Sequence, residues 1–127
     1  MHPKQYSTVL DLPSLQRYEY FIEKIASFQR IWILCRGERM ARLTDPQGVE
    51  LYPVWPEKKF AEACLIREWT DYQPKAVPLT VFADEWVPMM KDHQRQLRIF
   101  CTPKDMGVPI TPEEILQDIR TEMNHGS

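Results

Sequence analysis

The stretch from residue 53 to residue 79 constrains the fold most, because it combines prolines with large aromatic side chains. Each proline fixes φ and removes a backbone donor, so it stands at the start, the end or the edge of an element. Tryptophan and tyrosine offer large apolar area with a polar tip that needs a partner. The residues concerned are Pro53, Trp55, Pro56, Trp69, Tyr72, Pro74 and Pro78. We therefore expect this stretch to join a strand that ends near Pro56 to the helices that follow.

The first half of the chain predicts one helix followed by three short strands. Apolar side chains recur every three or four residues over residues 14–28, which indicates an amphipathic helix with Ser14 as its N-cap. The strands are expected at residues 31–35, 40–43 and 49–55. Short turns join them, so they predict an antiparallel meander. Pro53 restricts the third strand to an edge or a bulge.

The second half adds helices and short strands in mixed order. Helices are expected after Pro56, from a cap at Thr80 to a kink or an end near Pro88, and from a capping box at residues 111–114. Extended segments are expected at residues 76–77, 97–101 and 108–110. This order predicts one α+β domain, with an antiparallel meander sheet of about four to six strands and about four helices. The domain spans residues 12–124, after a loose tail at residues 1–11.

The composition excludes several classes of protein. Of the residues 43% are hydrophobic and 27% are charged, and the formal net charge of −2 provides no field that attracts nucleic acid. No apolar run approaches the roughly 20 residues of a membrane span, and the N-terminus lacks the apolar core of a signal peptide. The three cysteines are widely spaced, which disfavours a disulfide framework. We expect a reduced cytoplasmic protein that binds neither nucleic acid nor membranes.

The sequence contains no recognisable catalytic or metal-binding constellation. The glycines are isolated, so a glycine-rich phosphate loop is excluded. The histidines and cysteines lack metal-ligand spacing, and neighbouring carboxylates such as Glu113 and Glu114 do not face each other on a helix. His93 lies in a polar run and is expected to be exposed. We predict no catalytic residue, no metal and no cofactor.

Aromatic and basic residues provide the best candidates for a binding surface. Trp69 and Tyr72, followed by Lys75, would form an apolar wall with a charge beside it, and Arg36 belongs to a basic cluster on the first hairpin. The default interpretation makes the aromatics ordinary core residues and the hairpin arginines solvated charges, and the binding wall is the competing one. The leading hypothesis is a non-enzymatic module that binds a protein or peptide, or itself.

A second hypothesis is an enzyme or a small-ligand binder whose site is assembled from distant residues. Cys35, Arg36, His93 and Cys101 are its candidate members, since they offer nucleophilic, basic and anion-binding groups. This hypothesis requires the fold to bring at least two of them within hydrogen-bond reach.

Several spaced motifs resemble one family. They are Tyr52-Pro53-Val54-Trp55-Pro56, Ala61-Glu62-Ala63-Cys64, Glu68-Trp69-Thr70-Asp71-Tyr72, Pro74-Lys75-Ala76-Val77-Pro78-Leu79, Phe82 with Trp86-Val87-Pro88, and Phe100-Cys101-Thr102-Pro103 with Gly107-Val108. In this order they resemble the bacterial domain of unknown function 2750 (DUF2750), over residues 18–123. The resemblance implies a small, single-domain cytosolic protein, and it offers no catalytic residues to carry over. The succession of strand, Pro-Val-Trp-Pro, helix and Val-Pro-Leu is also similar, over about half the chain, to the N-terminal domain of SseB-type proteins. That second likeness concerns the fold alone.

Overall fold

The computed structural model describes residues 8–125 and shows a mixed α+β fold. The strands are β1 (Arg30–Arg36), β2 (Arg39–Met40), β3 (Leu43–Thr44), β4 (Glu50–Val54), β5 (Gln73–Pro78), β6 (Gln96–Ile99) and β7 (Val108–Ile110). The helices are α2 (Ser14–Phe28), α3 (Lys58–Glu62), η1 (Arg67–Trp69), α4 (Leu79–Val81), η2 (Phe82–Trp86), α5 (Val87–Asp92) and α6 (Pro112–His125). The α+β class predicted from the sequence is confirmed.

Two sheets take the place of the single meander that the sequence predicts. Sheet A is antiparallel in the order β2-β1-β5, and sheet B has the order β3-β4-β6-β7. Within sheet B, β4 runs parallel to β6, and the other pairs are antiparallel. The parallel pair needs a long crossover, here residues 55–95, and such a connection leaves no local pattern in the sequence.

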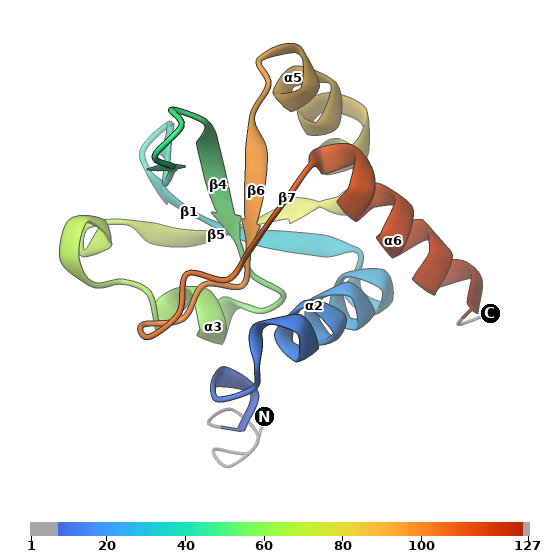
Figure 1. The fold of residues 1–127 in the computed structure, drawn as a ribbon, viewed down its shortest axis with the longest axis horizontal. Helices are drawn as coiled ribbons and strands as arrows, with labels where there is room; N and C mark the ends of the chain where they lie inside the picture. Colours follow the sequence, from blue (N-terminus) through green and yellow to red (C-terminus); the bar gives the residue numbers. More distant parts are fainter. Residues whose placement is uncertain (1–7, 126–127) are drawn as a thin grey trace.

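The sheets meet at Trp32 and Trp55, whose backbone groups exchange two hydrogen bonds of 2.9 Å. In Figure 1, β4 and β6 stand in front of β1 and β5 and cross them at a steep angle. Because β3 pairs only with Glu50 and Leu51, Pro53 pairs on one side alone, with β6. One-sided pairing is the situation that a strand proline tolerates.

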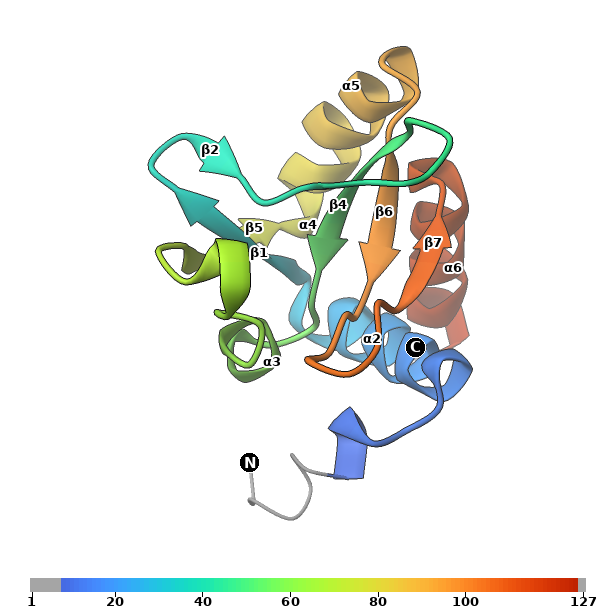
Figure 2. The ribbon, with the colours of Figure 1, turned by 60° about the vertical axis from the view of Figure 1, so that its left-hand side comes forward.

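The core is formed by apolar side chains from both sheets and from the two long helices. Fully buried members include Phe21 and Ile25 of α2, Leu34 of β1, Val54 of β4 and Ile115 of α6. Helix α2 packs against α6, where the Tyr18 hydroxyl donates to Asp118. Figures 1 and 2 show the two helices beside sheet B, with α3 at the opposite end of the molecule from α5.

Local predictions located most of the elements and were less accurate about their ends. The single strand expected at residues 40–43 is wrong, because these residues are divided between β2 and β3, which belong to different sheets. Helix α2 begins at Ser14 itself after Pro13, with no side-chain cap, so Ser14 is not the N-cap. The helix for which Thr80 was the expected cap begins at Leu79, so Thr80 lies inside it. This segment passes through a π-helical turn, η2, and continues beyond Pro88 to Asp92. The proline is accommodated in the first turn of α5, where its missing N–H costs least.

The N-terminal tail expected from the sequence is described only in part. Most of the expected tail, residues 1–11, falls outside the described residues; of the part that is described, residues 8–10 are helical and Val9 is 8% exposed. No helix within residues 8–125 has the length and apolar character needed to cross a membrane.

Candidate functional site

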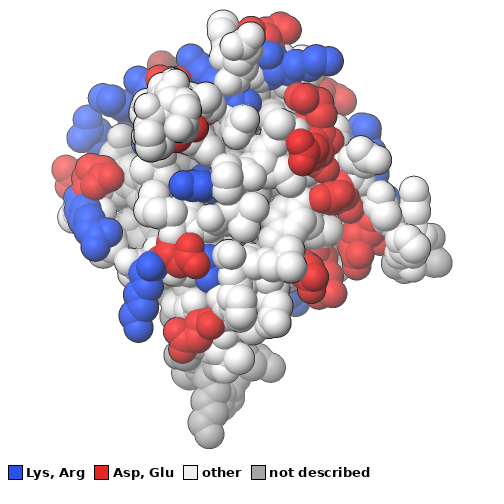
Figure 3. Space-filling view, viewed as in Figure 1, with Lys and Arg blue, Asp and Glu red and all other residues white. Residues whose placement is uncertain are grey.

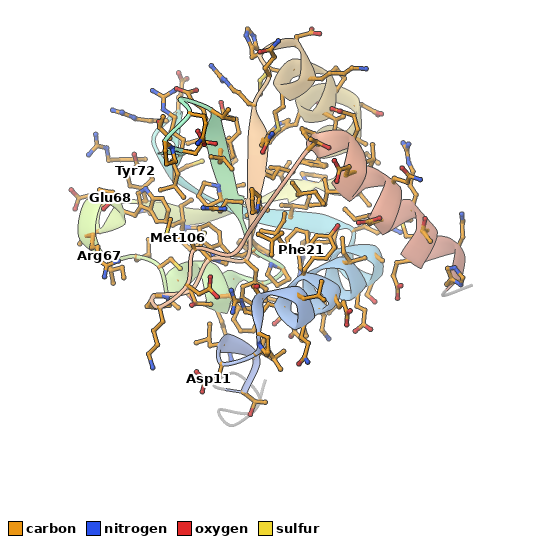
Figure 4. All side chains as sticks on the ribbon, viewed as in Figure 1. Asp11, Phe21, Arg67, Glu68, Tyr72 and Met106 are labelled. Atoms are coloured by element: carbon orange, nitrogen blue, oxygen red, sulfur yellow. The ribbon has the colours of Figure 1, made fainter. Side chains whose placement is uncertain are left out.

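A largely apolar pocket lies where η1 and the end of the α3 segment approach the loop between β6 and β7. Its walls are formed by Leu43, Cys64, Trp69, Cys101 and Met106, and we call it the Trp69 pocket. Ile66, Arg67, Glu68 and Thr102 complete its rim. Its empty space amounts to about 390 Å³, including its open mouth. In Figure 4, Arg67, Glu68, Tyr72 and Met106 lie on the same side of the molecule.

The position of Trp69 corrects the expectation that it forms an exposed wall. Trp69 is only 9% exposed and packs edge-on against Trp55, with ring centroids 6.3 Å apart at 88°. The buried Trp55 indole in turn donates to the Cys101 carbonyl at 2.9 Å. Burial follows from the large apolar area of the indole ring. Trp69 is therefore a core residue that forms the inner wall of the pocket, and only an edge of its ring faces the pocket.

The two thiols in the pocket behave as apolar groups. Cys64 donates through Sγ to the Cys101 carbonyl at 3.4 Å, and Cys101 donates through Sγ to the Met106 carbonyl at 3.0 Å. Burial raises the pKa of Cys64 to about 11 and that of Cys101 to about 12. Both thiols thus stay protonated near neutral pH, and a protonated thiol is a poor nucleophile.

Two exposed apolar side chains border the mouth of the pocket. Ile66 is 38% exposed and Met106 is 49% exposed, and both belong to the small set of large apolar side chains that face solvent among the described residues. Figure 3 shows that the adjoining face over β4 and β6 is mostly uncharged, whereas acidic side chains follow α6. An apolar pocket with apolar residues at its mouth is typical of a contact surface.

Backbone strain is also found at this pocket. Residues other than glycine with positive φ include Gln29 and Gln94, which follow the ends of α2 and α5, where such a conformation is common. Arg67 (φ 54°) and Phe100 (φ 59°) do not follow a helix in this way; Arg67 is on the rim, and Phe100 precedes Cys101. Strained residues of this kind gather at functional sites, so they support the choice of this pocket.

The other predicted binding residues lie beside the pocket, and none of them lines it. The backbone N–H of Tyr72 donates to the Trp69 carbonyl at 3.0 Å, and the Arg36 guanidinium lies 5.7 Å from the centre of the Tyr72 ring. Lys75 is exposed on β5, opposite Ile33 of β1. The structure thus brings Arg36 and Tyr72 together next to the pocket.

The structure separates the four candidates of the alternative site. Cys35 and Arg36 end β1, His93 is exposed after α5, and Cys101 is a buried residue in the wall of the Trp69 pocket. None of the hydrogen bonds or ion pairs among residues 8–125 joins any two of them. In the same part of the chain, no group of three His, Cys, Asp or Glu side chains is arranged to hold a metal ion.

Sequence reasoning missed most members of the pocket, among them the two exposed apolar residues at its mouth. Ile66 and Met106 lie in irregular segments, where no periodicity marks a residue as important. Cys64 was expected to be buried, and it is. Its hydrogen bond to Cys101 was not predicted, because the two residues are 37 positions apart. Only the fold brings these residues together.

The thiol environments predict the order in which the cysteines react. In the native protein near neutral pH, iodoacetamide is expected to label the half-buried Cys35 at least about tenfold faster than Cys64 or Cys101, since the latter two are buried thiols. Peptide mass spectrometry over time measures the three rates, and protein unfolded in urea serves as the control, with equal rates expected. Labelling of Cys101 as fast as that of Cys35 in the native protein would contradict the apolar role of this thiol.

Comparison with known protein families gives one match. A family model described as "Protein of unknown function (DUF2750)" matches residues 18–119. No curated protein matches the chain.

Proposed function

The chain belongs to the DUF2750 family, which is defined only as proteins of unknown function, and we propose that it is a non-enzymatic module that binds a protein or peptide at the Trp69 pocket. The partner inserts an aliphatic or aromatic side chain between Ile66 and Met106. The observation that carries this proposal is the apolar pocket with two exposed apolar residues at its mouth.

The chemistry of the pocket favours binding over catalysis. The two thiols inside it are held protonated, and the side chains that could assist them, Arg36 and His93, do not line it. The volume of the pocket that is open to water is about 60 Å³, well below the range for small-molecule sites, roughly 300–1,000 Å³. A pocket of this size suits one anchoring side chain with its neighbours spread over the rim.

The rim suggests how a partner would be oriented. Arg67 and Glu68 carry opposite charges beside the mouth, and Arg36 stacks on Tyr72 nearby. Arginine and tyrosine are frequent energetic centres of protein interfaces. A partner with an apolar anchor flanked by polar residues of both signs would therefore complement this surface.

The double variant Ile66→Ser, Met106→Ser is expected to weaken peptide binding by about tenfold or more, because it removes apolar contact from the mouth of the pocket. Peptides are first selected from a random display library on the unmodified protein, and the affinities of the selected peptides are then measured for both proteins. Selected peptides should share an aliphatic or aromatic residue at one position.

Leu15→Ser is the matched control, since Leu15 is 66% exposed on α2 and the substitution removes the same kind of side chain elsewhere. Sedimentation of the protein alone tests whether the partner is a second copy, in which case the same double variant should abolish the association. Peptides that bind the double variant as tightly as the original protein would show that the pocket is not the binding site.

A further inference from the structure

A second pocket lies at the other end of α3, where β1 begins. The rings of Phe28 and Trp32 and the charged groups of Arg30, Lys58 and Lys59 line it, and we call it the basic pocket. Its empty space amounts to about 620 Å³, including its open mouth, which is larger than that of the Trp69 pocket. It shares no lining residue with the Trp69 pocket, so it stands independently of the function proposed above.

The Arg30 guanidinium is held by two aromatic rings. It lies 5.8 Å from the centre of the Phe28 ring and 5.9 Å from the centre of the Trp32 ring. None of the ion pairs among the described residues involves Arg30 or Lys58. An arginine held in this way presents its planar set of N–H donors to a ligand at a small entropic cost.

The positive charge in this region exceeds the negative charge. Lys24 lies next to the pocket, with its ammonium group 5.8 Å from the centre of the Phe28 ring. Glu57 also lines the pocket, and its carboxylate accepts a hydrogen bond of 2.9 Å from the Tyr20 hydroxyl. Among the lining residues, the three basic side chains of Arg30, Lys58 and Lys59 thus accompany one engaged carboxylate, on a chain whose net charge is −2. This local excess favours an anion that carries more than one charge.

The shape and the chemistry of the lining restrict the ligand further. Aromatic walls favour a flat ring, because bases stack on aromatic faces and on guanidinium planes. Arginine and lysine together suit a phosphate group, the arginine through paired N–H donors and the lysine as a point charge. The volume of the pocket that is open to water is about 270 Å³, close to the lower bound for small-molecule sites, roughly 300–1,000 Å³.

We propose that the basic pocket binds a nucleoside phosphate. The planar base stacks beside Trp32 and the Arg30 guanidinium, and the phosphate lies between Arg30 and the lysines at the start of α3. The lining contains no glycine, so no glycine-rich loop takes part in this mode of binding.

Titration calorimetry with adenosine 5′-monophosphate, adenosine and inorganic phosphate tests the proposal on the full chain. The monophosphate is expected to bind more tightly than either fragment, since only it engages both the rings and the cations. Arg30→Ala is expected to weaken its binding by about tenfold or more, the effect of losing a charged hydrogen bond, and to reduce the salt dependence. Trp32→Ala is expected to cost about tenfold through lost stacking, and Trp32→Phe to retain most of the affinity.

Arg39→Ala is the matched control, because Arg39 is exposed near the opposite end of β1, where β2 pairs with it. Arg30 is exposed, so its removal tests the pocket even if the Trp32 variants unfold. Failure of the monophosphate to bind, or binding that Arg30→Ala leaves unchanged, would overturn the proposal. Binding of an acidic peptide with the same dependence on Arg30, in the absence of nucleotide binding, would replace the nucleotide with a protein ligand.

Discussion

Arg17→Ala is expected to lower the free energy of unfolding by about 3–6 kcal/mol, the sum of two charged hydrogen bonds of about 1.5–3 kcal/mol each. Arg17 is 2% exposed; its Nε donates to the Phe100 carbonyl at 3.2 Å and its Nη1 to the Leu12 carbonyl at 2.7 Å. The variant leaves both carbonyls without this donor, and a buried unsatisfied acceptor is costly. The ion pair with Asp105, at 3.1 Å, adds little because the Asp105 side chain is 45% exposed.

Urea unfolding monitored by tryptophan fluorescence measures this loss. Arg17→Lys is expected to recover only a minor part of the stability, since one ammonium group cannot replace donors that point in different directions. Arg120→Ala, which removes an exposed arginine from α6, serves as the control and is expected to change stability by less than about 0.5 kcal/mol. A loss below about 1 kcal/mol for Arg17→Ala would mean that this arginine contributes no more than a surface charge.

Arg17 also connects the stability of the fold to the Trp69 pocket. The Phe100 carbonyl that it binds directly precedes Cys101, and Asp105 directly precedes Met106 of the pocket wall. The strained conformation of Phe100 is thus held by a buried cation. We infer that Arg17 positions this loop.

Gly107→Ala is expected to cost about 3 kcal/mol or more, because it adds backbone strain of about 1–3 kcal/mol to overpacking of similar size. A Cβ atom at this position would lie 2.1 Å from the Ile99 carbonyl oxygen, and backbone atoms cannot rotate away. The φ of Gly107 is +81°, which disfavours any side chain. Its N–H donates to Asp105 at 2.9 Å. This hydrogen bond is the largest of the causes that lower the pKa of the Asp105 carboxyl, and the interaction with Arg17 lowers it further.

Gly37→Ala is the matched control for this variant. Gly37 has a φ of +61°, but nothing lies within 4 Å of the position of an added Cβ. Its replacement should therefore cost only the conformational strain of about 1–2 kcal/mol. Thermal and urea unfolding of both variants provide the comparison. Equal losses would show that the loop between β6 and β7 moves aside, and that Gly107 is needed only for its φ.

Local patterns allowed much of the fold to be predicted. The apolar period of α2 placed its bounds, and one of the two bonds of the capping box predicted at residues 111–114 is present, since the Glu114 N–H donates to the Thr111 hydroxyl at 3.2 Å. The uniformly apolar run at β1 likewise marked a strand within a sheet. The helices depend on neighbours three or four positions away and the strand on a short continuous run, and a sequence displays both directly.

The candidate site was predicted only in part. The aromatics around Trp69 did mark the right region, and of the two interpretations that the sequence left open for Trp69, a core residue or an exposed wall, the structure has the core residue. The exposed apolar surface belongs to Ile66 and Met106 instead. Which side of an aromatic segment faces solvent depends on what packs against it, and here that is Trp55 from another element.

By itself, the sequence determined the class of the fold, most of its helices and strands, and the family to which the chain belongs. Only the tertiary structure decided that the strands divide into two sheets, that β4 runs parallel to β6, and that the Trp69 pocket exists. The physical reason is the range of the interactions. A helical period is set within a few residues, whereas the bond from the Trp55 indole to the Cys101 carbonyl closes a separation of 46 positions, and its formation depends on the packing of everything between.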